Sequence, residues 1–319
     1  MITKKILIFG ASGQIGRNLI RKLTKSNYKV TAVTRDIHKK GYILKTQAPI
    51  GYLEIKQSNI FDYNSLSKLI EENDICINLV GILFEKGKNS FKNIHVDFPD
   101  LISKICKKKN IKQMIHISAL GLADAKNSKY ALSKLQGEKK IRENFEKAVI
   151  IKPSLVYSVD DSFTTRFFTL LNLMPIFPLY YKGVTKFTPI HVSDVVNLIF
   201  YIISNNILSK DIEAIGPEVL TFKQIIEKLL KSIDKKRLLL PIPLTLAKVS
   251  ASFFQLFPNP LLTRDQLNLL KYDNVKSDNG ISNFDLGCPS KILFEESINS
   301  YSFNWMEGGK FSIKKSNQN

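Results

Sequence analysis

The chain has 319 residues, of which 47 are Lys or Arg and 28 are Asp or Glu, so its formal net charge is +19. Hydrophobic residues make up 44% of it and charged residues 24%, ordinary globular values that exclude disorder as the main state. The charge is uneven, because residues 1–50 carry 11 basic and 1 acidic side chain and residues 101–150 carry 12 and 4. Such an excess indicates a polyanionic partner or a lysine-rich surface.

Several classes of protein are excluded by simple patterns. Three isolated cysteines and 4 histidines show neither a disulfide framework nor metal-ligand spacing, so we expect no metal and a reducing, cytoplasmic location. The N-terminal apolar run is too short for a signal peptide, and no apolar stretch reaches the ~20 residues of a membrane span. Basic residues are not interleaved with aromatic ones, so we expect no nucleic-acid partner.

Strand and helix patterns alternate through the first half of the chain. Short apolar runs rich in Val and Ile predict strands at 5–9, 28–34, 52–55, 74–80, 112–118 and 148–152. Apolar residues at helical spacing predict helices from about 14 to 25, 64 to 72, 94 to 109 and 128 to 144. The alternation predicts an α/β fold with a Rossmann-like, doubly wound parallel sheet.

The alternation stops after Pro153, where a Phe-rich helix begins near residue 163. Residues 186–206 contain an apolar helix that we expect to return to the first domain, and 221–233 is amphipathic. We therefore predict an NAD(P)-binding domain at 1–155 with 186–206 added. Residues 156–185 and 207–306 would form a smaller C-terminal α/β substrate domain, followed by a tail at 307–319.

A glycine-rich loop joins the first predicted strand to the first helix. In the run from Gly10 to Gly16, Gly10 would make the turn, Gly13 would admit a pyrophosphate and Gly16 would let helix and strand pack closely. The phosphates would lie on free N–H groups at the helix N-terminus, and a purely structural turn is the alternative. The residues of this run predicted to bind the cofactor are Gly10, Ser12, Gly13, Gln14, Ile15 and Gly16.

The end of the second strand indicates which dinucleotide is bound. An NAD site usually places an acidic residue here, whereas this chain has Thr34 and Arg35. Because an arginine can pair with a 2′-phosphate, we expect NADPH rather than NADH. The alternative is that Asp36 serves NAD and Arg35 is an ordinary surface residue.

A Tyr-x-x-x-Lys pattern, Tyr130 and Lys134, lies on one face of a predicted helix. A nearby ammonium favours the phenolate, so Lys134 would lower the pKa of Tyr130 and make it a general acid or base. Ser118 ends the fifth strand, where its side chain could reach the same site. A solvated helix face is the alternative, and the glycine loop argues against it.

With these features the chain resembles the extended short-chain dehydrogenase/reductase family over about residues 4–300. The resemblance implies that Ser118, Tyr130 and Lys134 are catalytic and also contact the cofactor. It implies further cofactor contacts after the third strand, the fourth strand and at the Pro turn, at Asn59, Ile60, Leu79, Val80, Gly81 and Pro153. The family usually has Asp where this chain has Asn59, and the stretch between Ser118 and Tyr130 is short.

A narrower resemblance is carried by INLVGILFE, IHISALG, KYALSKLQGEK, IKPSLVYSVDDSF, FTPIHVSDV, IGPEVLTF and LLTRDQLNLLKYDNV. These segments are similar to the nucleotide-binding accessory subunits of respiratory complex I and their alphaproteobacterial relatives. That group implies tightly held NADPH, complex I subunits as partners and a structural, redox-sensing or assembly role. The alternative is a free NADP-dependent reductase or epimerase acting on a quinone precursor, isoprenoid or sugar nucleotide, with Tyr130 as acid/base.

Residues 241–260 are the candidate for a peripheral contact with the anionic inner face of the cytoplasmic membrane. Their apolar members Leu244, Val249, Phe253, Phe254 and Leu256 could lie in a lipid interface or form a packed wall of the smaller domain. Close by, Arg264 and Asp265 could form an interface ion pair, and Thr263 could cap a helix.

Overall fold

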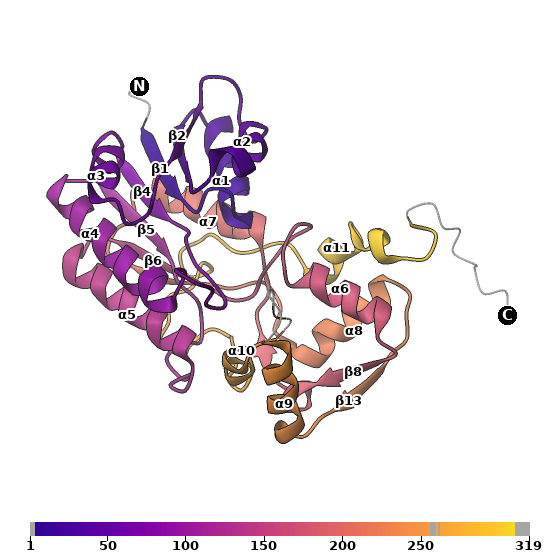
Figure 1. Ribbon diagram of the computed structural model, residues 1–319. Coiled ribbons are helices and arrows are strands. Elements are labelled where there is room, and N and C mark those ends of the chain that lie inside the picture. The colour runs from indigo at the N-terminus through magenta and orange to yellow at the C-terminus, as the bar shows by residue number, and fades with distance from the viewer. Residues whose placement is uncertain (1–3, 256–259, 261, 310–319) are drawn as a thin grey trace.

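The computed structural model describes residues 4–255, 260 and 262–309 (Figure 1). A large lobe contains the N-terminal half of the chain, and a smaller lobe carries most of the C-terminal third. The large lobe is built on seven parallel strands in the order β11-β6-β5-β4-β1-β2-β3, which confirms the Rossmann-like α/β prediction. The strands are β1 (Lys5–Phe9), β2 (Lys29–Thr34), β3 (Leu53–Gln57), β4 (Ile75–Asn78), β5 (Gln113–Ile117), β6 (Val149–Pro153) and β11 (Asp211–Ala214).

Helices cover both faces of this sheet, because its central strands are apolar on both sides. One face packs against α1 (Gln14–Lys25), α2 (Ile37–Lys45) and α7 (Val192–Ser204). The other face packs against α3 (Tyr63–Glu71), α4 (Phe98–Lys108) and α5 (Lys129–Asn144). Helix α4 is preceded by a π-helical stretch, η1 (Lys92–Asp97), where a regular helix was predicted from residue 94. Such π-bulges often mark functional sites.

The smaller lobe packs its helices and short strands around a separate apolar core that includes Phe168, Phe177, Ile225 and Phe294. Its strand pairs are β10 with β7, β12 with β9 and β13 with β8. The remaining elements are β7 (Val156–Tyr157), α6 (Thr164–Leu173), β8 (Ile176–Leu179), η2 (Tyr180–Gly183), β9 (Lys186–Phe187), β10 (Ile190–His191), β12 (Leu220–Thr221), α8 (Phe222–Ser232), β13 (Leu238–Pro241), α9 (Leu244–Phe254), α10 (Arg264–Leu269), α11 (Phe294–Asn299) and η3 (Ser302–Trp305).

One predicted boundary is corrected by the sheet. Residues 207–306 were assigned to the smaller domain, but β11 pairs in parallel with β6 as an edge strand of the large lobe. The four residues Asp-Ile-Glu-Ala alternate in polarity, because an edge strand is partly exposed, and so lack the apolar run that marked the central strands. The apolar pattern also does not predict α2, since apart from Ile37 its apolar residues are the consecutive run at 42–44 and do not recur every three or four residues.

Helix α9 lies in the region predicted to be a lipid face or a packed wall. Ala247 and Ala251 are buried against Tyr180 and Leu267, while Leu244 and Val249 are exposed. The side chains of Phe253 and Phe254, and Leu256, lie outside the described part of the chain. Among the described helices, none has the length and apolar character needed to span a bilayer.

Helix α5 approaches η1 so closely that only glycine fits at position 137. A Cβ on Gly137 would lie 1.9 Å from the carbonyl oxygen of His95, a backbone atom that cannot move without shifting η1. We expect Gly137→Ala to lower the free energy of unfolding by about 3 kcal/mol, measured by urea denaturation. The matched control is Gly41→Ala within α2, where the nearest atom is the side-chain Cγ1 of Ile37 at 3.1 Å. We expect that variant to keep or gain up to about 1 kcal/mol, and equal losses in both variants would contradict the packing argument.

Candidate functional site

The glycine loop forms the cradle that the sequence predicts. Gly10 has a φ of 77°, and a Cβ there would lie 2.9 Å from the carbonyl carbon of Leu79. A Cβ on Gly16 would lie 2.5 Å from the carbonyl oxygen of Ala11, so glycine is what brings α1 onto the loop. The N-cap of α1 is Gly13, which provides no side-chain cap, so the first N–H groups of α1 can receive a phosphate. These positions fit a dinucleotide.

Neighbouring strands bring the other predicted cofactor residues to the same edge of the sheet. Phe9 is in register with Val33 and Asn78, so Arg35 and the Leu79–Gly81 turn flank Gly10 on either side. The other predicted residues follow β3 and β6. Asn59 is exposed, and its Oδ1 accepts a hydrogen bond from Phe61 N, which leaves the amide NH₂ to contact a base. Pro153 is buried at the end of β6, and Ile60 is 8% exposed.

Arg35 and Asp36 have different surroundings. Asp36 is the N-cap of α2, where its Oδ1 accepts a hydrogen bond from Lys39 N at 3.0 Å, and this bond lowers its pKa. Arg35 is exposed and donates to Asn89 Oδ1 at 3.1 Å, and no carboxylate pairs with it in the described part of the chain. Its charge is therefore available to a ligand.

Tyr130 and Lys134 lie on the inward face of α5. Lys134 is 4% exposed, and its Nζ donates to Ile117 O at 3.1 Å and lies 3.4 Å from where a Cβ on Gly81 would be. Burial lowers the pKa of Lys134 to about 8, against the opposing effect of Glu138. Burial, reinforced by Asp265, raises the pKa of Tyr130 to about 12. The pKa of Tyr130 is therefore shifted upward by burial and by Asp265, opposite to the expectation that Lys134 lowers it, and Tyr130 keeps its proton at neutral pH.

Ser118 is placed differently from the expectation that it points toward Tyr130. Its hydroxyl donates a hydrogen bond to Glu138 on the inward face of α5. The other carboxylate oxygen of Glu138 pairs with Lys152 at 3.0 Å, and Lys152 also pairs with Asp211 at 2.8 Å. Ser118 therefore belongs to a network that joins α5 to β5, β6 and β11.

His95, which sequence patterns did not indicate, joins the turn after β4 to α5. Its Nε2 accepts from Ile82 N at 3.1 Å and its Nδ1 lies 2.9 Å from Ser133 Oγ. Because Ser133 Oγ donates to Tyr130 O, His95 Nδ1 carries the proton and donates to Ser133. The ring also meets the Tyr130 ring edge-on at 5.3 Å. Sequence spacing offered no signal for it, since the contact depends on the π-helical stretch.

The start of α5 is held by the smaller lobe. Asp265, at the start of α10, accepts hydrogen bonds from Lys129 N at 2.7 Å, Tyr130 N at 3.0 Å and Ser128 Oγ at 2.8 Å. Its carboxylate thus accepts hydrogen bonds from free N–H groups at the N-terminus of α5, and its negative charge interacts favourably with the positive end of the helix dipole. The predicted helix cap is present, because Thr263 caps α10 through a capping box. The predicted ion pair between Arg264 and Asp265 is absent from the described contacts, and Asp265 instead accepts hydrogen bonds from the start of α5.

The segment after β7 contacts the glycine loop from the other side. Gln14 Nε2 donates to Ser158 Oγ at 2.8 Å, and Arg17 pairs with Asp160. Local sequence patterns do not place Ser158 and Asp160 at the cofactor site, because nothing local links a polar turn to a loop more than 140 residues earlier. Arg17 is therefore committed to this contact.

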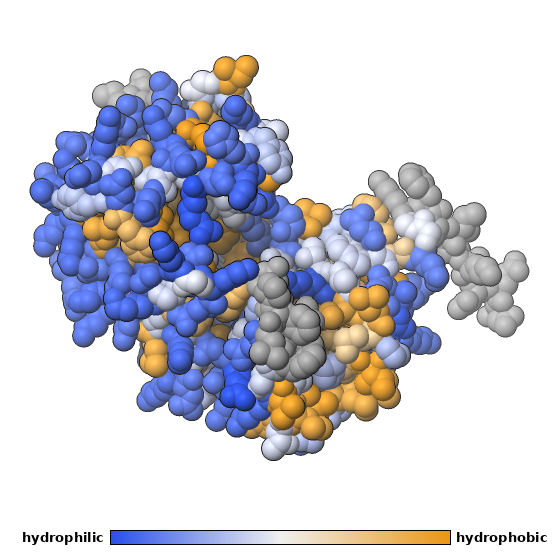
Figure 2. Space-filling model, in the orientation of Figure 1, coloured by the Kyte–Doolittle hydropathy of each residue, from blue (hydrophilic) through white to orange (hydrophobic). Residues whose placement is uncertain are grey.

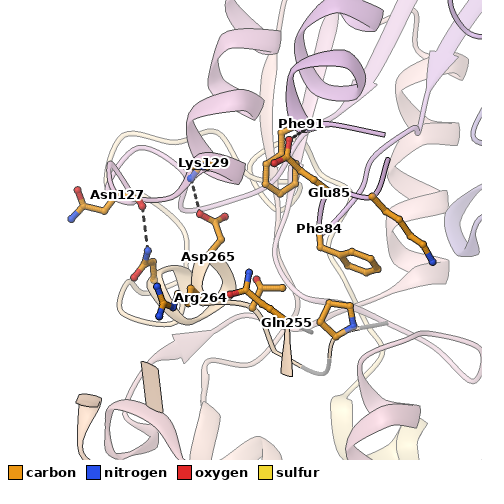
Figure 3. Close-up of a pocket in the computed structure, with 12 residues that line it drawn as sticks. Phe84, Glu85, Phe91, Asn127, Lys129, Gln255, Arg264 and Asp265 are labelled. Carbon is orange, nitrogen blue, oxygen red and sulfur yellow. Dashed lines mark hydrogen bonds between the residues drawn. The ribbon is translucent and has the colours of Figure 1, made fainter. Parts of the chain in front are cut away.

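A cavity of about 680 Å³ opens beside this site, between residues 84–91, the start of α5 and α10 (Figure 3). Phe91, which lines it, meets the Tyr130 ring edge-on at 5.8 Å. The close-up shows Asp265 turned toward Lys129 and Glu85 turned toward Phe91. No group of three or more His, Cys, Asp or Glu side chains is arranged to hold a metal ion within the described residues.

The burial of His95 predicts a pH dependence of stability. Burial, reinforced by Lys134, lowers the pKa of His95 from 6.5 to about 3, so the unfolded chain binds this proton more readily than the folded one. The stability due to neutral His95 is complete above pH 6.5 and is lost as pH falls from there toward 3. Between pH 7 and pH 5 the free energy of unfolding of the unmodified protein should decrease, and His95 should account for about 2 kcal/mol of that decrease. In His95→Gln the decrease should therefore be smaller by this amount. Parallel pH curves, measured by urea denaturation, would contradict this.

Comparison with known proteins places this geometry in a family. The model of the NAD dependent epimerase/dehydratase family matches residues 6–216. Among solved structures, the UDP-glucuronic acid 4-epimerase of Bacillus cereus in complex with UDP-glucuronic acid and NAD has a TM-score of 0.71 at 19% identity, covering 93% of this chain and 98% of that one. That likeness supports the fold.

Curated relatives extend over most of the chain. The 40 kDa subunit of mitochondrial NADH-ubiquinone oxidoreductase from Neurospora crassa is 23% identical, over 88% of this chain and 74% of that protein. Subunit 9 of the NADH dehydrogenase [ubiquinone] 1 alpha subcomplex from Mus musculus is 25% identical, over 91% and 78%. A ceramide reductase of Caulobacter vibrioides is 24% identical over 59% and 57%. With a family model matching most of its length, from β1 to the end of β11, this chain belongs to the NAD dependent epimerase/dehydratase family.

Proposed function

We propose that this protein is an accessory or assembly subunit of respiratory complex I that binds NADPH as a structural or redox-sensing group. The observation that carries the proposal is the pair of relatives from Neurospora crassa and Mus musculus, both named as subunits of this enzyme, which align with nearly the whole chain. The agreement extends through both lobes, whereas a shared cofactor alone would require only the first.

The geometry supports a role in binding more than in turnover. The cradle formed by Gly10 and Gly16 is intact, and Lys134 lies buried beside the turn after β4. Ser118, however, donates its hydroxyl to Glu138, so it is committed to the network that holds α5 to the sheet. Two members of the predicted catalytic set thus face the site and the third supports the scaffold.

NADPH rather than NADH is proposed because of the charges at the end of β2. Arg35 is exposed with no carboxylate partner in the described residues, and Asp36 uses its side chain to cap α2. A guanidinium in this place can form paired hydrogen bonds with a 2′-phosphate, which NADH lacks. Asp36, by contrast, has one carboxylate oxygen already bonded to the backbone.

A peripheral contact with the membrane is proposed for the end of the smaller lobe. Figure 2 shows apolar residues gathered over β8, β13 and α9, where Leu238, Leu246 and Val249 are 56%, 59% and 67% exposed. Lys236 and Lys248 are exposed on or beside the same elements. Apolar side chains among lysines are suited to the interface of an anionic bilayer, on the inner face of the cytoplasmic membrane.

A free NADP-dependent reductase or epimerase is the second candidate, favoured by the Tyr130 and Lys134 pair and by the similarity to a ceramide reductase. A bound nicotinamide would supply or accept hydride. When hydride is supplied to the substrate, the Tyr130 hydroxyl, protonated at neutral pH, would donate the proton that completes the reduction, and Lys134 would orient the cofactor through its ammonium.

The two candidates differ in what accompanies the protein and in what Tyr130 does. Native mass spectrometry of the protein recovered from its own membranes is expected to show complex I subunits and a bound dinucleotide. Tyr130→Phe should keep the bound dinucleotide, because binding depends on the glycine cradle and Lys134. Recovery with neither complex I subunits nor dinucleotide would contradict the first candidate, and substrate turnover abolished by Tyr130→Phe would support the second.

Removing Arg35 tests the choice of cofactor. Arg35→Ala is expected to weaken NADPH binding about tenfold or more, measured by calorimetry, and to leave NADH binding unchanged. Lys40→Ala, which removes an exposed charge from the neighbouring helix, is the matched control. If the ratio of NADPH to NADH affinity is the same in Arg35→Ala as in the control, Arg35 does not bind the phosphate.

A further inference from the structure

The cavity between the lobes is separate from the dinucleotide cradle. Its lining comes from residues 84–91, the start of α5 and the region of α10, and includes none of the residues predicted to bind the cofactor (Figure 3). Its volume of about 680 Å³ is within the range of small-molecule sites, roughly 300–1,000 Å³. The cavity therefore has room for a ligand of its own.

The carboxylates that line this cavity have hydrogen-bond partners within the protein, whereas its cations have no acidic partners in the described residues. Its two carboxylates hold backbone, since Glu85 Oε1 accepts from Phe91 N at 2.7 Å and Asp265 accepts from the start of α5. Its three cations, Lys86, Lys129 and Arg264, are exposed, and none pairs with a carboxylate in the part of the chain that the structure describes. Arg264 bonds through Nε to Ser252 Oγ at 2.6 Å, which leaves its two NH₂ groups without a side-chain partner in the described region.

The N-terminus of α5 cannot be the anion site here, because Asp265 already occupies it. An incoming anion would instead be held by the cationic side chains at the rim, where a phosphate or carboxylate can accept several charge-assisted hydrogen bonds. Binding at these side chains would leave the hydrogen bonds between Asp265 and the start of α5 in place.

One wall of the cavity is apolar and rigid. Phe91 is 7% exposed and is fixed between the His95 ring, stacked at 5.3 Å, and the Tyr130 ring at 5.8 Å. Phe84, from the same segment, is half-buried and its ring points into the cavity (Figure 3). A ligand that reaches both features needs an apolar body as well as an anionic head.

We propose that this cavity binds an anionic amphiphile, a phosphate monoester carried on a short apolar body. The phosphate contacts Lys129 and Arg264, with Lys86 at the rim, and the apolar body lies against Phe84 and Phe91. This site does not rest on the proposed function, since it requires neither complex I nor the dinucleotide.

The test uses octyl phosphate as the probe, titrated calorimetrically into the full-length protein below its micellar concentration. Octanol and inorganic phosphate supply the apolar and anionic parts separately. We expect octyl phosphate to bind about tenfold or more tightly than either. Equal affinity for octyl phosphate and octanol would overturn the proposal, because the cations would then contribute nothing.

Variants locate the site. Lys129→Gln and Arg264→Gln are each expected to weaken octyl phosphate binding about tenfold, since a charge-assisted bond is lost in each. Lys139→Gln removes a lysine from the outer face of the same helix, where the side chain is 78% exposed, and is expected to have no effect. Equal weakening in Lys139→Gln would overturn the proposal by showing a nonspecific charge effect. Phe84→Ser should reduce binding of octyl phosphate and leave inorganic phosphate unchanged.

Two further measurements identify the source of the ligand and separate this cavity from the dinucleotide cradle. Vesicles of phosphatidylcholine and phosphatidylglycerol that compete with octyl phosphate would identify the ligand as a bilayer lipid, whereas vesicles without effect would identify a soluble phosphate ester. NADPH binding, measured in the same variants, is expected to be unchanged. Failure of NADPH binding with normal octyl phosphate binding would therefore count against the proposed function alone.

Discussion

The close packing of α5 against η1 and the sheet is the constraint on which the rest of the site depends. Only a hydrogen atom fits at position 137, so the axis of α5 cannot shift relative to the π-helical stretch. With the helix fixed there, its inward residues have defined partners. Tyr130 meets the imidazole ring of His95, Lys134 donates to a carbonyl oxygen of β5, and Glu138 accepts from the hydroxyl that follows β5. The same close approach that positions Tyr130 and Lys134 also places Glu138 where it bonds to Ser118 and Lys152.

The basic residues that produce the net charge of +19 have different physical roles in the structure. Surface lysines such as Lys104, Lys109 and Lys112 are paired with carboxylates and contribute little to stability. Lys134 is buried and has lost much of its preference for the charged form. Arg35, which has no acidic partner in the described residues, lies in the turn after β2, where a ligand can reach it.

Most secondary-structure elements of the large lobe can be predicted from short sequence patterns. The strands of the large lobe other than β11, the glycine loop and the facing of Tyr130 and Lys134 follow from apolar runs, turn residues and helical spacing. The partner of Ser118 could not be predicted, because it depends on which strand face lies beneath α5. The motif around Asp265 is local, but the contact of Asp265 with the start of α5 spans 135 residues of sequence and depends on how the two lobes pack together. The direction of the Tyr130 pKa was wrong for a related reason: burial is a property of the packed molecule.

The position of β11 has a consequence for how this chain is made. The chain leaves the large lobe after β6, builds part of the smaller lobe and returns to place β11 beside β6, while residues 281–283 cover the outer side of β11. During synthesis the edge of β6 therefore stays open until residue 214 has emerged, and that of β11 until residue 283 has emerged. An open edge is a template for pairing with other chains. The two lobes are thus interlaced along the sequence, and no single cut in the chain yields either of them as a complete, separately folding fragment.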